Sequence, residues 1–192
     1  MTGVRNAAAF AVGTLDFLSG PGEMARRIRE YDWTSTGLGA PVSWSMPLKT
    51  LVGLMLSSVQ PMFMAWGSER TWLYNDAFVP ILGNKHPWAL GRGALDEVWQ
   101  EAAGALEPLF EKVFAGEPVH MEDFAVMLDR RGRLEEAHFT YSYTPVRDER
   151  GSIVGLFGAS RRLRRERSPS ASGRPSRNGN AGRSSRHRAS SS

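Results

Sequence analysis

The 192-residue sequence contains no cysteine. This excludes disulfide bonds, thiolate metal sites, cysteine nucleophiles and photochemistry through a cysteine–flavin adduct. The sequence also lacks any stretch near the roughly 18 to 20 apolar residues that a membrane helix requires. The opening run "VRNAAAFAVGTLDFLSG" is a poor signal peptide, because its apolar segment is short and is broken by Asp16. We therefore expect a cytoplasmic protein that does not enter a membrane.

Residues 161–192 lack aromatic residues and contain one Leu. They hold ten Arg and one acidic residue, a net charge of +9, whereas residues 1–160 hold 14 basic and 19 acidic residues, a net charge of −5. A segment of this kind buries too little apolar surface to offset the entropy of ordering, so the sequence predicts a disordered Arg/Ser-rich tail. Such a tail could bind nucleic acid through its charge, although no aromatic side chain interleaves the arginines.

Residues 1–43 are expected to form an N-terminal extension. The stretch "GEMARRIREYDW" favours a short amphipathic helix with Met24, Ile28 and Tyr31 on one side, and "TSTGLGAPVSW" is typical of a loop. A flanking helix is predicted over residues 45–60. Its apolar face is wider than one packing surface needs, so the helix either sinks into its own domain or pairs with another chain. The apolar residues are Leu48, Leu51, Val52, Leu54, Met55, Leu56 and Val59.

The compact core is predicted over residues 61–160. "MFMAWG" and "TWLYN" should form a hairpin, and "DAFVPIL", "WALG" and "ALDEVW" are short helical pieces. A regular amphipathic helix then runs from about residue 101 to Gly116. The strands "VHMEDFAVML", "LEEAHFTYSYTPV" and "SIVGLFGAS" follow as a meander. The order predicts an α+β fold, in which a five-stranded antiparallel sheet carries short helices on one face.

Several segments in this order and spacing resemble a PAS domain, over about residues 44–160. The resemblance is closest to the N-terminal PAS module of some bacterial sensor histidine kinases. It rests on the segments "GEMARRIREYDW", "LGAPVSW", "LKTLVGLML", "PMFMAWG", "LYNDAFVPILGNKHPWALGR" and "EEAHFTYSYTPVRDERGSIVG". The kinase core is missing, because His187 lies in low-complexity sequence and no Gly-rich phosphate-binding loop follows. We therefore expect no enzyme activity.

Asn75 and Asp76 stand where a strand gives way to a helix. A general acid or base at this position would need a partner and a buried pocket. A cap that accepts the free N–H groups of the following helix explains both residue types and their position. The resemblance implies the same role.

The other polar candidates do not form a catalytic or metal-binding pattern. His86, His120 and His138 are widely separated, so no metal site is predicted. Haem-binding PAS domains use a His on the long helix, which is absent here, and only His120 lies near that helix. Neither haem nor flavin is expected. The paired acids are interpreted as solvated, because neighbours on a strand point to opposite faces: Glu122 and Asp123, Glu135 and Glu136, Asp148 and Glu149.

The resemblance implies a cavity between sheet and helices, which either binds a small ligand or is filled by its own side chains. The candidate lining residues are Met64, Trp72, Phe110, Phe124, Phe139, Tyr141 and Phe157. The sequence thus predicts a non-catalytic sensory module that acts through a small ligand or through contact in a homodimer or with a sensor kinase. The alternative is a nucleic-acid-associated protein that works through its tail.

Overall fold

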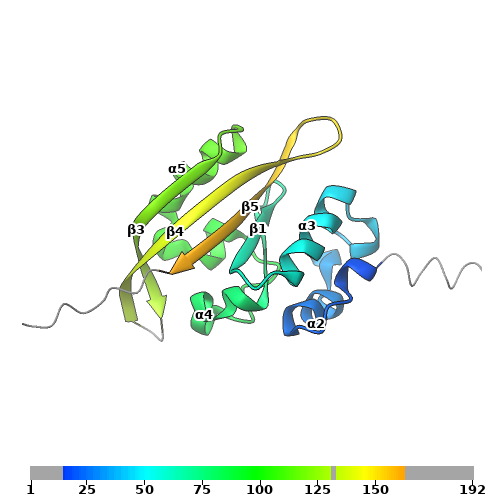
Figure 1. Cartoon of the computed structure of the whole chain (residues 1–192), viewed down its shortest axis with the longest axis horizontal. Coiled ribbons are helices and arrows are strands. Elements are labelled where there is room, and N and C mark those ends of the chain that lie inside the picture. Colours follow the sequence, from blue (N-terminus) through cyan, green and yellow to red (C-terminus); the bar gives the residue numbers. More distant parts are fainter. Residues whose placement is uncertain (1–14, 131–132, 163–192) are drawn as a thin grey trace, which may run out of the picture.

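A computed structural model describes residues 15–130 and 133–162. Its centre is a five-stranded antiparallel sheet in the order β2-β1-β5-β4-β3. The strands are β1 (Met62–Trp66), β2 (Thr71–Tyr74), β3 (Val119–Arg130), β4 (Arg133–Arg147) and β5 (Ile153–Arg162). The last strand closes the sheet by pairing with both β4 and β1 (Figure 1). This strand order confirms the predicted α+β arrangement of the PAS fold.

The connection from β2 to β3 carries the helices that cover one face of the sheet. It contains α4 (Val79–Leu82), single helical turns, and the longer α5 (Ala103–Phe114). The turns are η4 (Asp76–Phe78), η5 (Gly83–Lys85), the π-helical η6 (Ala94–Val98) and η7 (Gln100–Ala102). In Figure 1, α5 lies behind β3, β4 and β5. The stretch "WALG", expected as helix, forms turns instead, and Gly91 has the positive φ of 77° that a turn favours.

The N-terminal part contributes η1 (Asp16–Leu18), α2 (Glu23–Glu30), η2 (Trp33–Ser35), η3 (Pro41–Ser43) and α3 (Met46–Ser57). The periodic residues of the predicted helices face inward, since Met24, Ile28 and Val52 are fully buried. Trp33 and Trp44 are buried as well and meet edge to face, with ring centroids 5.1 Å apart. Residues 15–43 thus pack into the same hydrophobic core as the sheet.

The two edge strands of the sheet, β2 and β3, differ in how their free edges are covered. The edge of β2 is covered by residues 91–94, which pair with it through Gly93. The edge strand β3 is long, and its pairing with β4 shifts register between Met121 and Phe124. Asp123 lies in this bulge with a φ of 50°, a left-handed conformation that Asp tolerates better than most residues.

The C-terminal strand extends slightly beyond its predicted end. β5 continues through Arg161, which pairs with Thr140, as far as Arg162. The first two residues of the predicted tail therefore belong to the sheet. The rest of that tail lies outside the described residues.

Candidate functional site

A closed cavity lies between α5 and the inner face of the sheet. Its lining is almost entirely aromatic and aliphatic. The space that the centre of a water molecule can occupy is only ≈ 20 Å³, whereas ligand pockets span about 300–1,000 Å³. The cavity therefore has room for about one water molecule. Its walls are formed by Phe63, Trp72, Phe78, Ile81, Trp99, Leu106, Phe110, Val126, Leu128, Tyr141 and Tyr143.

Three of the seven predicted lining residues, Trp72, Phe110 and Tyr141, reach this cavity. Phe124 and Phe139 instead pack around the Tyr141 ring, with centroids 6.0 and 5.3 Å from it. The other two predicted residues, Met64 and Phe157, lie on the opposite face of the sheet.

Met64 and Phe157 are paired across β1 and β5. Neighbouring residues on a strand point to opposite faces, and Phe63 lines the cavity, so Met64 and its partner point away from it. The sequence shows that these residues are apolar and lie on strands. It could not predict which face of the sheet α5 covers.

One residue of the cavity lining carries a buried polar atom without a hydrogen-bond partner. Trp72 is 2% exposed, and its Nε1 makes no hydrogen bond. Burial raises the pKa of the Tyr141 and Tyr143 hydroxyls well above 10.0, so both side chains stay neutral. The cavity lining thus includes tyrosine and tryptophan side chains and no charged residue.

One wall of the cavity is held by a buried lysine that sequence reasoning missed. Lys85 is 7% exposed, and its Nζ lies 4.6 Å from the centroid of the Trp99 ring. The same Nζ donates to the Val98 carbonyl and to Glu101 Oε1, the latter at 2.5 Å. Glu101 Oε1 also accepts from the backbone N of Asp129 at 3.1 Å. This ion pair ties η5 and η7 to β3 and fixes Trp99 in place.

Asn75 joins the start of the sheet to the helical connection. Its Oδ1 accepts from Phe78 N at 3.2 Å, as expected of a cap, and from Met62 N at 3.0 Å. Its Nδ2 donates to the carbonyls of Met55, Ser58 and Gln60. Asn75 is 1% exposed, and its side chain contacts five backbone groups, with the two Nδ2 protons shared among three carbonyls. It is a structural residue.

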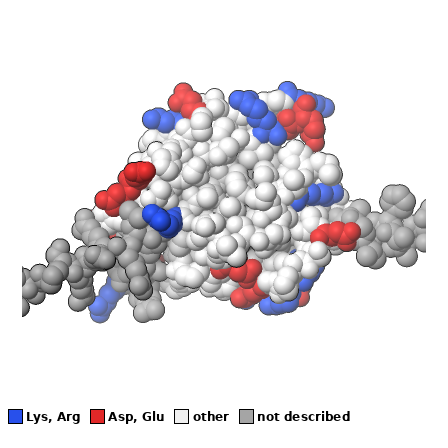
Figure 2. Space-filling view, viewed as in Figure 1, with Lys and Arg blue, Asp and Glu red and all other residues white. Residues whose placement is uncertain are grey.

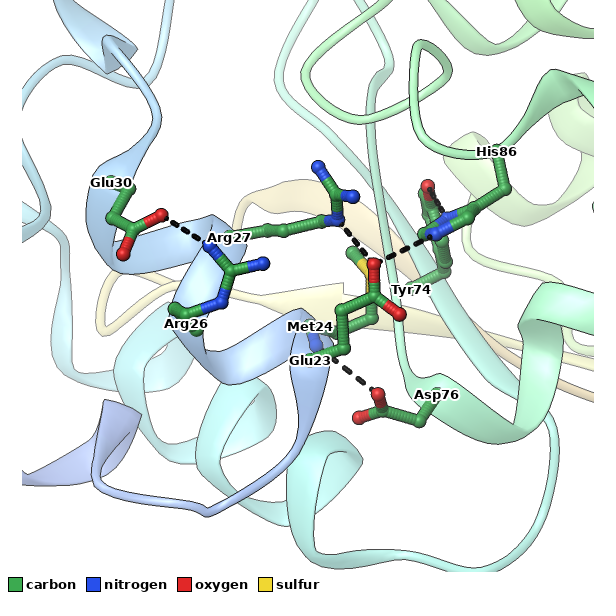
Figure 3. Close-up of polar contacts among 8 residues, drawn as sticks. All are labelled: Glu23, Met24, Arg26, Arg27, Glu30, Tyr74, Asp76 and His86. Atoms are coloured by element: carbon green, nitrogen blue, oxygen red, sulfur yellow. Dashed lines mark hydrogen bonds and ion pairs between the residues drawn. The ribbon is translucent and has the colours of Figure 1, made fainter.

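Asp76 caps a different helix from the one that follows it in sequence. Its Oδ1 accepts from Met24 N, at the start of α2, at 3.2 Å. The approach is so close that a Cβ on Gly22 would stand 2.3 Å from Asp76 Oδ2. Asp76 therefore attaches α2 to the core (Figure 3).

A second connection runs beside it from the core to α2. The buried Tyr74 hydroxyl meets His86 Nδ1 at 2.9 Å, and His86 Nε2 meets Glu23 Oε1 at 3.3 Å (Figure 3). Arg27 Nε donates to the same Glu23 oxygen at 2.7 Å. These bonds, first from Arg27 and then from His86, lower the pKa of Glu23 below 4.5. His86, which the sequence left without a partner, thus links α2 to β2.

The two remaining sequence candidates lie on β3 and β4. His138 has 10% of its side chain exposed and lies between Asp123 Oδ1 at 2.7 Å and Glu136 Oε1 at 2.9 Å. His120 is exposed and lies 3.6 Å from Glu122. Over residues 15–130 and 133–162, no group of three His, Asp or Glu side chains could hold a metal ion.

The paired acids otherwise match their interpretation as solvated groups. Glu122, Asp123, Glu136 and Glu149 are exposed. Asp148 is half-buried and accepts from the backbone N of Arg150 and Ser152 in the β4–β5 turn. The side chain of Glu135 lies outside the described residues.

The outer face of the sheet, opposite the cavity, has a different composition. Ser142 and Thr144 of β4 are exposed, and across the ladder they face Ala159 and Phe157 of β5, which are half-buried. Figure 2 shows this face as a broad uncharged centre with Lys, Arg, Asp and Glu around its rim, as far as the described residues go. We call this region the uncharged face.

Apolar side chains of the flanking helix are exposed as well. Met46 is 66% exposed and Leu54 is 52% exposed, and the two lie two turns apart along α3. The inward residues Leu48, Val52 and Met55 are buried in the same helix. One side of this helix therefore packs into its own domain, as the first alternative expected, while Met46 and Leu54 stay exposed. No helix within the described part of the chain has the length and apolarity to cross a bilayer.

A scan against protein-family models and a search of curated proteins return no match to this sequence. Solved structures give likenesses of fold at low identity. The Rhodobacter sphaeroides LOV protein is 15% identical with a TM-score of 0.48, covering 62% of this chain and 68% of that chain. The PAS domain of Bordetella pertussis BvgS is 24% identical with a TM-score of 0.48, covering 62% and 88%. The PAS domain of the fruit-fly ELK potassium channel is 10% identical with a TM-score of 0.47, covering 60% and 96%.

Proposed function

We propose that this chain is a non-catalytic PAS signalling module that works by contact between proteins through the uncharged face. The partner is a second copy of the chain, as in the input segment of a sensor histidine kinase. The observation that carries the proposal is the contrast between a nearly filled cavity and an uncharged outer face. A module that senses by binding a ligand needs free internal volume, and about one water molecule of space is too little for an organic ligand.

The surface chemistry supports contact with another protein. Interface cores are depleted in charged residues, whereas their rims are polar. The uncharged face follows this pattern, and the exposed Met46 and Leu54 of α3 add apolar surface. In this mechanism a change in the partner shifts the populations of two arrangements of the pair, and the sheet transmits that shift.

The test places a charge in the middle of the uncharged face. Ser142→Glu changes an exposed side chain on β4, so the fold should tolerate it. A buried unpaired carboxylate opposes association, and we expect the dimer dissociation constant to rise by on the order of tenfold or more. Sedimentation equilibrium of the full chain over a wide concentration range measures this.

A matched control uses the other side of the molecule. Ala105 is exposed on α5, so Ala105→Glu adds the same charge away from the uncharged face. It should leave the dissociation constant unchanged. A chain that stays monomeric at millimolar concentration, or two variants with the same association behaviour, would contradict contact between copies. Deleting residues 1–43 is not a suitable test, because Leu18, Met24 and Trp33 belong to the core.

A further inference from the structure

Two open pockets meet on the surface where residues 31–45 pack against the β1–β2 turn. One has a volume of ≈ 500 Å³ and the other of ≈ 470 Å³, and both values lie within the range of pockets that bind small molecules. Glu69 and Thr71 line both pockets, so the two are continuous at these residues. Neither pocket shares a lining residue with the closed cavity.

The larger pocket, which we call the apolar pocket, is lined mainly by aromatic and aliphatic side chains. Trp44, Leu48 and Trp66 form the buried part of this lining, whereas Phe114 and Val154 are half-buried. These side chains come from parts of the chain that are distant in sequence, and they converge on one concave site. An apolar group that enters the site gains free energy, because both surfaces are removed from water.

The smaller pocket, which we call the acidic pocket, has a polar lining with an excess of negative charge. Its charged residues are three acids, Glu69, Asp96 and Glu97, and one base, Arg92, which gives a net charge of −2. Arg92 Nη1 donates to Glu97 Oε2 at 3.1 Å, so these two charges compensate each other. Glu69 and Asp96 are exposed and form no ion pair within the described part of the chain. Their two carboxylates are therefore available to a cation.

Gly93 allows the acidic residues to gather around one point. A Cβ on Gly93 would stand 3.5 Å from the Glu69 carbonyl oxygen, 3.6 Å from Glu97 Oε1 and 3.9 Å from Asp96 Cβ. Gly93 also pairs with Thr71 of β2. The three acids thus surround the covered edge of β2.

Thr71 adds a polar group where the two pockets join. It is 2% exposed, and its hydroxyl forms no hydrogen bond with any residue that the structure describes. An ammonium group has three N–H donors, which is enough to reach this hydroxyl and a carboxylate at the same time. A cationic group at this junction would therefore find both charge and hydrogen-bond acceptors.

We propose that the two pockets together bind a small amphipathic amine. Its apolar body occupies the apolar pocket, and its ammonium group lies between Glu69, Asp96 and Thr71. The ammonium donates charge-assisted hydrogen bonds to the carboxylates, and the body covers the half-buried apolar side chains. Such a ligand touches both residues 31–45 and the sheet, so it strengthens the attachment between them. The site does not depend on association between copies, because all its lining residues belong to one chain.

The test uses 2-phenylethylamine as the probe, with two relatives that separate its parts. The alcohol 2-phenylethanol lacks the charge, and ethylamine lacks the apolar body. Each is titrated into the ¹⁵N-labelled full chain, and the shifts of the backbone amide signals give the dissociation constant. We expect 2-phenylethylamine to bind about tenfold more tightly than either relative, or more. The largest shifts should occur at residues 67–71 and 93–97, which border the junction.

A pair of double variants tests the role of the carboxylates. Glu69→Gln with Asp96→Asn removes both charges and nearly preserves the shapes, and the new amide oxygen at position 69 can still accept from Gly37 N. The dissociation constant of 2-phenylethylamine should rise about tenfold, to that of the alcohol. The control, Glu107→Gln with Glu111→Gln, changes net charge equally at exposed positions of α5 outside both pockets. It should leave the dissociation constant unchanged.

Three results would overturn the proposal. Equal affinities for the amine and the alcohol would show that charge plays no part in binding. The same loss in both double variants would show attraction by the net charge of the whole chain. The absence of saturable shifts near the junction, at every concentration that can be reached, would show that the pockets do not bind this class of molecule.

Discussion

The two faces of the sheet carry different kinds of side chain. The inner face carries large rings, and Phe63 lies against Trp72 and Tyr143 with centroids 4.4 and 5.5 Å away. The outer face is mixed: Met64 is buried on β1, Phe157 is half-buried on β5, and Ser142 and Thr144 of β4 are exposed. The inner face is covered by α5 and leaves little space, whereas the outer face is exposed over β4. The difference leaves more surface available for contact on the outer face than volume available for a ligand in the interior.

The largest expected effect comes from removing an inner ring. Phe63 is 1% exposed, so Phe63→Ala should lower the free energy of unfolding by about 3–5 kcal/mol. Phe157→Ala, on the half-buried outer side, should cost roughly half as much, because less apolar area is buried there. Urea denaturation of both variants measures the difference. Equal losses would mean that the two faces are equally packed and would remove the basis of the comparison.

The next largest expected effect on stability concerns the unpaired indole N–H of Trp72. Trp72 and Trp33 are both nearly fully buried, but Trp33 Nε1 donates to the Ile28 carbonyl at 2.7 Å, whereas Trp72 Nε1 has no partner. Trp33→Phe leaves a buried carbonyl without its donor, while Trp72→Phe removes an unsatisfied donor. Trp72→Phe should therefore be the milder change by about 1–3 kcal/mol. The same loss in both variants would show that a water molecule already satisfies Trp72.

A smaller effect concerns the attachment of α2. Asp76→Ala removes the acceptor for Met24 N and should cost about 1 kcal/mol. Hydrogen exchange should accelerate at the first amides of α2 while the amides of β4 and β5 keep their protection. Uniform acceleration across the chain would show instead that Asp76 supports the whole fold.

The smallest effect is a dependence on pH. Hydrogen bonds from Arg27 and His86 lower the pKa of Glu23 in the folded state. The contribution of Glu23 to the free energy of unfolding is therefore present above the ordinary pKa of 4.5 and is lost as the pH falls through the lower pKa of the folded state. Glu23→Gln should therefore lower stability slightly at pH 7 and leave it unchanged at the acid end, so the fall in stability on the acid side becomes flatter. Unfolding midpoints of both proteins between pH 3 and 7 provide the measurement. Parallel curves would show that the contacts of Glu23 with Arg27 and His86 are absent in solution.

Much of the fold could be predicted because local patterns and tertiary packing agree. The helical spacing of Leu48, Val52 and Met55, the alternation in β4 and the cap at Asn75 all match the structure. The sheet and its meander follow from these elements, and the order and spacing of the segments made the PAS resemblance visible.

The rest depends on contacts between residues far apart in sequence. Nothing near Lys85 indicates that Glu101 and Trp99 will enclose it. Asp76 looks like a cap for its own helix, yet its partner lies 52 residues earlier at Met24. The lining of the cavity depends on which face α5 covers, and periodicity alone leaves both faces equivalent.

The bulge at Asp123 has a consequence for how copies of this chain can meet. A twelve-residue edge strand such as β3 would ordinarily invite a strand from another molecule to extend the sheet. The register shift between Met121 and Phe124 divides that edge into two shorter ladders and bends the backbone between them. Growth by the edge, which would lead to open-ended fibres, is thereby disfavoured.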